Sequence, residues 1–513
     1  MTVMQQRPAG GSVDLRAFQL AFQLARCDAM RVAVAMHGQA SIRGVYPDHL
    51  RWRSANTTES RFDITFGSWI MAAQRPPRVA IIGGGLAGLS AATHLLNRAQ
   101  DQLDVTLFDM GARGVGGRAS HRTEPHRFSH GLQFLSLHPS APLAHKEVIQ
   151  TWLDEDRIVE LPLGGWLDAQ RAQYTTAKPP PHDGFFGAMT EGARVYIPKG
   201  GGVRTLCQSL AEDALAKGLT LRTQCRVREV AKHLVSPDGP SKWHLFGNTA
   251  DNAVHHEMSE KAAKAAADEP LGESFDALVI TDSMMFLEKW HRCSLIGLAS
   301  CAPNLVAKLG GTVPMEPLFS LMVAFPAGTD DDVPFDAACV YHCSTLQWIC
   351  RERARGGAAA ADDDACCWTL VSTREFAEQR ISEVPMRNAS EYLPTWQYAP
   401  QEASYLLSDP AQMMLQALRR ATGAFNAAPT HCLAQRWGAA YPQSSDGVSD
   451  GGACVVDDST MACAAGDFAY HCKDSAASAA GGMAAILSGK AVADELVARF
   501  TVDVSQSSLF QLV

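Results

Sequence analysis

The chain has 513 residues, a formal net charge of −9 and a pI near 6.0. This length is sufficient for two domains and a large core. The acidic balance argues against nucleic acid as a partner, and no apolar run is long enough for an integral membrane segment.

The cysteines are scattered along the chain without paired C-x-x-C sites, which favours a reducing intracellular compartment. Cys339, His342, Cys343 and Cys350 lie close together in the sequence, but no second Cys/His pair with suitable spacing accompanies them. We therefore interpret them as small buried side chains and predict no metal site.

Residues 1–75 are predicted to form an N-terminal extension. Residues 1–70 lack the glycine and strand patterns of the rest and contain arginine but no lysine. One interpretation is an organelle transit segment, which would direct the protein to a plastid or mitochondrion, although such segments usually avoid acidic residues. The other is a disordered tail, which would leave the protein cytoplasmic.

A buried strand at Val79–Ile82 is predicted to lead into a helix that begins near Leu86. Between them, Gly83, Gly85 and Gly88 form the pattern G-x-G-x-x-G. The first glycine permits a tight turn, the second lets the backbone approach a pyrophosphate, and the third lets the helix pack on the strand. The N-terminus of the helix then faces the phosphates.

The second predicted strand, Val105–Asp109, ends in an acid about twenty residues past the last glycine. Asp109 can bind the hydroxyls of an adenosine ribose. A second glycine cluster, Gly114–Arg118, follows directly and suits a loop under the same pyrophosphate, with Arg118 supplying cationic donors. Together with the C-terminal motif described below, this cluster favours FAD over NAD.

The middle of the chain alternates between helices and strands. Helices are predicted at 148–152 and 203–217, and strands at 219–222, 226–230, 243–246, 275–281, 319–325 and 368–372. The strand at 275–281 is expected to return to the nucleotide-binding sheet, and the strand at 319–325 to belong to a second sheet. Residues 248–273 are expected to form a solvated insertion, and residues 353–365 a low-complexity loop.

Near the C-terminus, a strand of small residues leads into Gly466 and Asp467. Gly466 would let the backbone approach a cofactor, and Asp467 could accept a hydrogen bond from a ribityl hydroxyl. The following helix, predicted at 476–496, carries Gly481 and Gly482 and could pack closely against a ring. Its N-terminus would favour the negative charge that develops at the flavin N1–C2=O group.

These elements predict an α/β fold in which a Rossmann-type FAD-binding domain, built from both chain ends, holds an inserted α+β substrate domain. The oxidoreductase unit is expected at 76–500, with a tail at 501–513. The FAD-binding parts are expected at about 76–140, 196–290 and 430–500, and the substrate-domain parts at about 141–195 and 291–429. The ligand should lie where the two domains meet.

The combined motifs resemble the FAD-dependent amine-oxidase superfamily, and within it the renalase-like branch. The matching stretches are 82–88, 114–118, 127–134, 200–206, 346–349, 435–442 and 465–468. The His-Gly-x-Gln stretch at 130–133 and the Arg-Trp-x-x-Ala-x-Pro stretch at 436–442 point to that branch. Ser129 stands where the branch commonly has Asp, and residues 351–357 match its basic loop only loosely.

The resemblance implies an oxidase of misreduced dihydronicotinamide nucleotides, with O2 as electron acceptor and H2O2 as product. It also implies that the strand at Val227 lays its backbone against adenine. The alternatives are an amine oxidase or a carotenoid-desaturase-like enzyme on the same fold, and a non-catalytic flavin-binding scaffold. FAD is expected to be non-covalent, because the chain lacks a Ser-Gly-Gly-Cys stretch, although Cys472 lies close after Asp467.

Three side chains are predicted to act at the reacting centre. His130 would position substrate or flavin, with a structural role as the alternative. Gln133 would hold a carboxamide or a flavin carbonyl, and Trp437 would form a stacking wall. Arg436 would reach either a phosphate or an interdomain carboxylate. The predicted FAD-binding residues are Gly83, Gly85, Leu86, Ala87, Gly88, Asp109, Arg113, Gly116, Gly117, Arg118, Val227, Gly466, Asp467, Gly482 and Met483.

Overall fold

A computed structural model shows how the described part of the chain folds. The described residues are 75–99, 101–111, 113–161, 165–177, 184–234, 241–248, 269–272, 274–286, 295–309, 315–352, 365–383, 409–442, 452–470 and 481–501. Several sequence-based expectations lie outside these residues: those for the N-terminal extension, most of the predicted insertion and of the low-complexity loop, Cys472, and the tail.

A six-stranded sheet with the order β18-β19-β12-β1-β2-β8 forms the nucleotide-binding side of the molecule. Its central strand β1 (Arg78–Ile82) pairs in parallel with β2 (Asp104–Phe108) and with β12 (Ala277–Ile280). The outer strands are β8 (Thr220–Arg222), β19 (Ala462–Ala464) and the antiparallel β18 (Val455–Asp457). Strands from both ends of the described chain therefore build one sheet, which confirms the expected α/β class.

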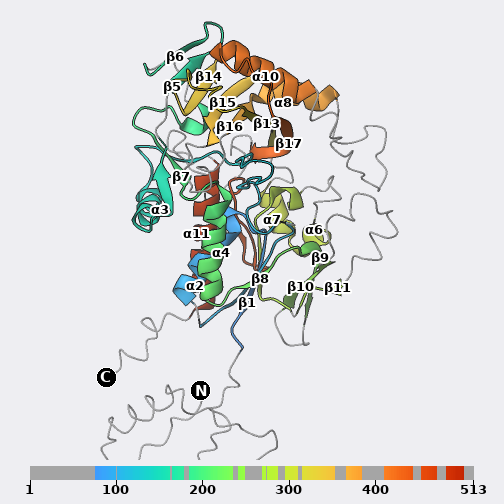
Figure 1. Ribbon diagram of the computed structural model, residues 1–513. Coiled ribbons are helices and arrows are strands. Elements are labelled where there is room, and N and C mark those ends of the chain that lie inside the picture. Colours follow the sequence, from blue (N-terminus) through green and yellow to red (C-terminus); the bar gives the residue numbers. More distant parts are fainter. Residues whose placement is uncertain are drawn as a thin grey trace, which may run out of the picture. The chain divides into compact units, whose positions relative to one another are not determined.

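Three helices cover one face of this sheet: α2 (Leu86–Ala99), α4 (Arg204–Ala216) and α11 (Gly482–Phe500). They lie side by side in Figure 1, with α2 in contact with both others. A Cβ atom at Gly489 would lie 2.2 Å from the carbonyl oxygen of Ala87, so this glycine lets α11 approach α2 closely. The described helix α11 begins at Gly482, directly after Gly481 with its φ of +59°, and the predicted helix residues 476–480 lie outside the described part.

The other face of the sheet packs against an antiparallel sheet of β9 (Arg226–Leu234), β10 (Ser241–Asn248) and β11 (Glu269–Pro270). The short helices α6 (Leu298–Cys301) and α7 (Pro303–Lys308) join the same core, which contains Trp243, Phe275 and Leu305. Residues 295–309 therefore belong to the nucleotide-binding side. This corrects the expected boundary near residue 290, because the apolar face of α7 is buried against strands of that side.

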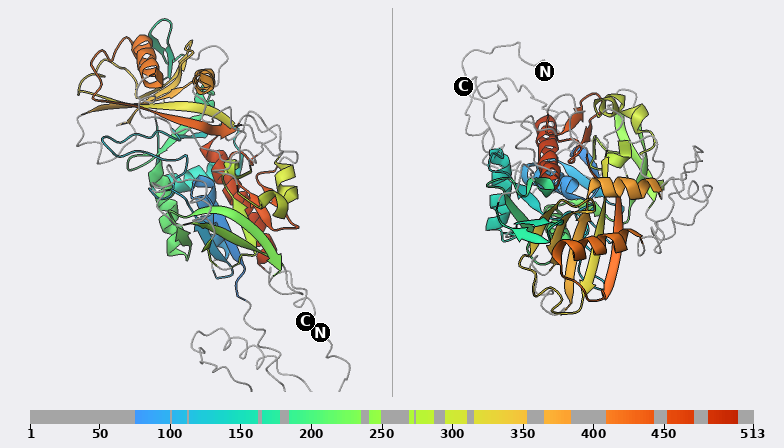
Figure 2. Two further views of the ribbon diagram at one scale, coloured as in Figure 1. Left: turned by 90° about the vertical axis from the view of Figure 1, so that its right-hand side faces the viewer. Right: turned by 90° about the horizontal axis from the view of Figure 1, so that it is seen from above.

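A second, seven-stranded sheet has the order β17-β13-β16-β15-β14-β5-β6. Its strands are β17 (His431–Pro442), β13 (Met315–Phe325), β16 (Cys366–Ser372), β15 (Leu346–Arg351), β14 (Ala337–Tyr341), β5 (Gly165–Asp168) and β6 (Gln173–Thr175). Helices α8 (Arg374–Glu383) and α10 (Asp409–Thr422) cover one face, as Figure 2 shows. The expected boundary near residue 430 is wrong, because β17 pairs along β13 as far as Pro442.

A small sheet of β3 (Leu135–Leu137), β7 (Arg194–Pro198) and β4 (Ile158–Glu160) lies beside α3 (Leu143–Asp154). Ile149 and Trp152 of α3 share the core of α2, α4 and α11, so this segment packs with the nucleotide-binding side. This corrects the assignment of the whole of 141–195 to the substrate domain. Within the described part of the chain, no helix is both long and apolar enough to cross a membrane.

Candidate functional site

A cavity of about 730 Å³ lies between the carboxyl ends of the parallel strands and the seven-stranded sheet. Its walls come from the β1–α2 turn, the loops after β2 and β12, the 130–134 segment, β13, β17 and the start of α11. In open α/β sheets, ligands bind in the crevice outside the carboxyl ends of the strands, and this cavity occupies that position.

The three glycines of the β1–α2 turn have different roles. Gly83 has a φ of +111°, and its N–H donates to the carbonyl oxygen of Phe108 at 2.8 Å. A Cβ at Gly85 would meet only the carbonyl oxygen of Gly116, at 3.9 Å, so the backbone there is open to the cavity. A Cβ at Gly88 would lie 1.9 Å from the oxygen of Gly83, because the helix packs tightly on the turn. Gly88 does not line the cavity, which corrects its assignment as a ligand contact.

Asp109 lies directly after β2 and joins the glycine turn to the next loop. Its carboxylate accepts hydrogen bonds from the N–H groups of Gly84 and Gly111, each at 2.8 Å. Burial raises the pKa of Asp109, and these two N–H groups act against that effect. Sequence reasoning missed Gly84, where a Cβ would lie 2.8 Å from the carboxylate. The run of three consecutive glycines was the available signal.

Arg118 and Asp467, predicted to contact different parts of FAD, form a bidentate ion pair. The two N–O distances are 2.7 and 2.5 Å, and Arg118 also donates to the carbonyl oxygen of Ala440 at 2.8 Å. Burial lowers the pKa of Arg118, but the Asp467 carboxylate more than offsets this, so the pKa is raised. The pair joins the loop after β2 to the segment after β19 at the cavity wall.

Most of the other predicted cofactor residues also line the cavity. These are Leu86, Ala87, Arg113, Gly116, Gly117, Val227, Gly466 and Gly482. Met483 does not, because its side chain is fully buried in the core beneath α11. Its assignment as a cofactor contact is therefore corrected.

His130 lies against Trp437, with ring centroids 5.5 Å apart and planes inclined by 20°. Neither ring nitrogen of His130 has a hydrogen-bond partner among the described residues. Burial, together with the positive charge of Arg122, lowers the pKa of His130 to about 3. The imidazole is therefore neutral at physiological pH, and a ligand could use one nitrogen as donor and the other as acceptor.

Trp437 stacks on the ring of His130 and also forms a hydrogen bond with its backbone. Its Nε1 donates to the carbonyl oxygen of His130 at 2.9 Å and to Oγ of Ser320 at 3.2 Å. Ser320, on β13, donates to the same carbonyl oxygen. The backbone of His130 is thus tied to two strands of the seven-stranded sheet.

Gln133 lines the cavity but does not offer its amide hydrogens to a ligand. Its Nε2 donates to the carbonyl oxygens of Ser129 and Gly131, both at 2.7 Å. An amide nitrogen has two hydrogens, so both are used within the turn. A contact in which Gln133 donates to a flavin carbonyl is therefore replaced by a role in holding the shape of the His130 segment, while Oε1 leaves a contact with a carboxamide as a prediction.

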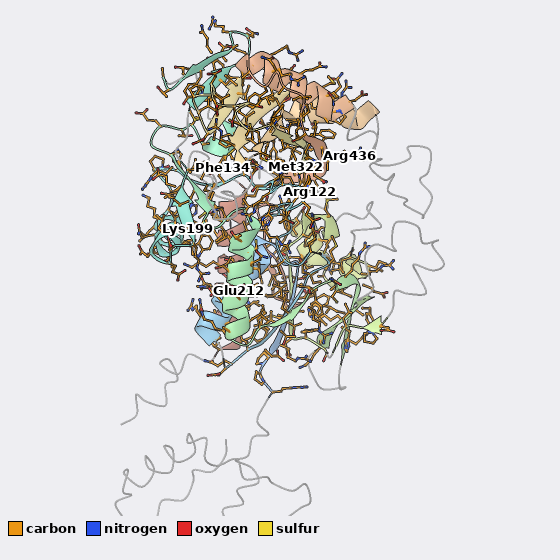
Figure 3. All side chains as sticks on the ribbon, viewed as in Figure 1. Arg122, Phe134, Lys199, Glu212, Met322 and Arg436 are labelled. Atoms are coloured by element: carbon orange, nitrogen blue, oxygen red, sulfur yellow. The ribbon has the colours of Figure 1, made fainter. Side chains whose placement is uncertain are left out.

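Arg436 turns away from Trp437. Alternate residues of a strand point to opposite faces, and Arg436 pairs with Phe319, which packs under α8 and α10. Figure 3 labels Arg436 on this sheet. Arg436 is nevertheless among the residues that line the cavity, so a phosphate contact and an interdomain carboxylate both stay predictions for it.

At the end of the cavity near the seven-stranded sheet, Phe186 and Tyr441 form an aromatic pair. Their ring centroids are 5.0 Å apart and their planes are inclined by 76°. Phe186 lies in the short 3-10 helix η4 (Phe185–Gly187) with a φ of +48°. A non-glycine residue there is strained, and such strain concentrates at ligand sites. In the sequence, only the flanking glycines Gly184 and Gly187 indicate an unusual backbone conformation at Phe186.

Comparisons with known proteins agree with this geometry. Residues 81–150 match the family described as an NAD(P)-binding Rossmann-like domain. The chain contains a Rossmann-like domain. The comparison with curated proteins found no match.

Solved structures extend the likeness beyond the Rossmann-like domain. A putrescine oxidase bound to putrescine is 12% identical with a TM-score of 0.52, over 83% of this chain and 100% of that one. A cyclohexylamine oxidase from Brevibacterium oxydans IH-35A is 12% identical with a TM-score of 0.47, over 82% of this chain and 100% of that one. At this identity, the putrescine oxidase likeness establishes a shared fold.

Three polar residues of the nucleotide-binding side line the cavity and were missed from the sequence: Arg204, Thr281 and Asp282. Arg204, at the start of α4, donates from Nε to the carbonyl oxygen of Val115 at 3.0 Å. Thr281 donates from Oγ1 to the carbonyl oxygen of Ile82 at 2.8 Å. The sequence signals available for them were the glycine turn before Arg204 and the buried strand before Thr281 and Asp282.

Proposed function

We propose that the chain is an FAD-dependent oxidase. It takes hydride from a small substrate, with misreduced dihydronicotinamide nucleotides as the substrate class, and passes the electrons to O2 to give H2O2. One observation carries the proposal: the glycine turn of the Rossmann-like domain and the strands β13 and β17 line the same cavity. A dinucleotide held at the turn would therefore extend toward a pocket built by the second sheet.

Several features of the cavity favour FAD. The backbone at Gly85 is open for a pyrophosphate, and Asp109 follows β2 as a ribose-binding acid does. NAD(P) uses the same turn, but Gly116–Arg118 and Gly466–Asp467 add a second set of lining residues that a nicotinamide dinucleotide does not require. Bound FAD supplies a ring that accepts hydride.

The residues around His130 suit a substrate that needs no strong base. An imidazole with a pKa of about 3 is a weak proton acceptor at neutral pH. A dihydropyridine expels hydride by means of its own ring nitrogen, so it requires positioning and exclusion of water. His130 can provide a neutral hydrogen bond, while Trp437, Phe186 and Tyr441 can hold a flat ring.

An amine oxidase is the second candidate, and the aromatic pair favours it. Phe186 and Tyr441 provide the kind of aromatic wall that suits an amine substrate. An amine oxidase is also expected to have a lysine near the reactive flavin nitrogen, but the cavity residues in the described part of the chain include no lysine.

The test is anaerobic mixing of the purified yellow protein with primary amines and with dihydronicotinamide isomers, followed by flavin absorbance. Bleaching within seconds by a misreduced isomer, with none by amines, supports the proposal. Bleaching by a primary amine alone would replace it with an amine oxidase. Release of H2O2 in air separates either enzyme from a flavin-binding scaffold.

A further inference from the structure

Asp282 is a carboxyl group in the cavity that neither the sequence motifs nor the proposed chemistry uses. It follows β12, the strand that pairs with β1 and β19 in the middle of the parallel sheet. Because carboxyl ends of parallel strands meet at one edge, Asp109, Asp282 and Asp467 converge there from β2, β12 and β19. All three line the same cavity.

The other two acids already have partners for both of their oxygens. Asp109 accepts from the N–H groups of Gly84 and Gly111, and Asp467 accepts from Arg118 through both oxygens. Asp282 differs, because its Oδ1 accepts from the N–H of Met284 at 3.0 Å while the half-buried side chain faces the cavity.

The surroundings of Asp282 disfavour a negative charge. Burial raises its pKa, and the carboxylates of Asp467 and Asp109 act in the same direction. The N–H of Met284 and the guanidinium of Arg118 oppose them, but Arg118 already forms its bidentate ion pair with Asp467. A pyrophosphate bound at the start of α2 would add further negative charge to this edge of the sheet.

We propose that Asp282 binds the dinucleotide as a neutral carboxylic acid that donates a hydrogen bond, so that cofactor binding is coupled to the uptake of one proton. This inference rests on the proposed function. A carboxyl group has one O–H donor when protonated and none when ionised, so only the neutral form of Asp282 can donate to a phosphate oxygen of the ligand.

The coupling has a definite sign. The complex holds the Asp282 proton more tightly than the free protein does, so the FAD dissociation constant rises as pH rises between the two pKa values. The rise is at most about tenfold per pH unit for one proton. His121 and His130 contribute little above about pH 6, because their pKa values are lowered to about 4 and about 3.

The experiment is titration of the full-length, FAD-stripped protein with FAD, followed by flavin fluorescence, between about pH 5.5 and 8.5. Asp282→Asn keeps the shape and gains a permanent N–H donor. We expect the wild-type dissociation constant to rise with pH and that of Asp282→Asn to rise less. Calorimetry in two buffers of different ionisation enthalpy should show fewer protons taken up by the variant.

The matched control is Asp276→Asn, at the opposite end of the strand segment that contains β12. Asp276 accepts from the backbone N–H of Arg78 and pairs with Lys242, and it does not line the cavity. The Asp276→Asn variant also replaces one carboxyl group by an amide. Its FAD dissociation constant should depend on pH as that of the wild type does.

Two results would overturn the role of Asp282. One is an Asp282→Asn variant whose pH dependence and proton uptake equal those of the wild type. The other is a variant that binds FAD more than about tenfold more weakly at every pH, which would mean that an ionised Asp282 accepts a hydrogen bond. If the folded wild type binds no FAD at any pH, the proposed function itself fails, and the inference fails with it.

Discussion

Arg118 and Asp467 pair through two hydrogen bonds although 349 positions separate them in the chain. Arg118 belongs to the loop that follows β2, and Asp467 to the segment that follows β19. The side chain of Asp467 is only 3% exposed, whereas that of Arg118 is 35% exposed at the cavity. The pair therefore joins two walls of the cavity, and Arg118 remains accessible from it.

Asp467→Ala should weaken FAD binding, because it removes the partner that holds Arg118 in place. The loss of a charge-assisted hydrogen bond is worth roughly 1.5–3 kcal/mol, or about ten- to a hundredfold in affinity. Titration of the FAD-free protein measures the effect. If the two residues act as a unit, Arg118→Gln combined with Asp467→Ala should be little worse than either change alone.

Gly85→Ala and Gly88→Ala should have opposite consequences. A methyl group at Gly85 would point into the cavity, so FAD affinity should fall while the stability of the FAD-free protein changes little. A methyl group at Gly88 would meet the backbone of Gly83 and should destabilise the fold by roughly 1–3 kcal/mol. Urea unfolding and FAD titration of both variants separate the two roles. Equal loss of stability in both would contradict this assignment.

The purified protein should be yellow and should release FAD when it is denatured. The expectation rests on the glycine turn, Asp109 and Gly466–Asp467 lining one cavity. Absorbance and mass analysis of the released cofactor measure it. A colourless protein that takes up no FAD on refolding would refute FAD binding, whereas a flavin adduct on the intact chain would refute only the non-covalent attachment.

His130 should make the stability of the FAD-free protein depend on pH. The folded protein keeps this imidazole neutral down to about pH 3, whereas the unfolded chain takes up the proton near pH 6.5. The unfolded state therefore binds more protons below pH 6.5, and stability falls as pH falls.

Between about pH 7.5 and 5, the wild type should lose roughly 2 kcal/mol more than His130→Gln. Urea unfolding at the two pH values measures this difference. His138→Gln, at a surface histidine that contacts Ser140, provides the control and should behave as the wild type does. A His130→Gln variant with unchanged pH dependence would show that the imidazole is not held neutral.

Phe186→Ala should weaken substrate binding without changing the affinity for FAD. The contact of one aromatic side chain with a flat substrate ring contributes roughly 0.5–1.5 kcal/mol. Loss of this contact corresponds to about a two- to tenfold rise in the substrate dissociation constant. Rates of anaerobic flavin reduction against substrate concentration measure it. Tyr174→Ala breaks a comparable pair with Phe335 outside this cavity, so it should leave substrate binding unchanged.

The sequence by itself determined the parts of the protein that depend on local backbone geometry. Gly83, Gly85 and Gly88 predicted the turn, because a tight strand–helix turn requires backbone angles and close approaches that only glycine allows. The spacing from this turn to Asp109 located the acid after the second strand. The apolar runs at β1, β2 and β12 likewise predicted strands buried on both faces.

Only the tertiary structure decided which distant residues meet. Pairing of β17 with β13 moved residues 431–442 into the second sheet, and it turned Trp437 and Arg436 to opposite faces. The sequence shows that a strand alternates, but it does not show which partner fixes the register. The contact of Arg118 with Asp467 and the place of Asp282 in the cavity depend on segments brought together by packing. Long-range packing of this kind leaves no local pattern in the sequence.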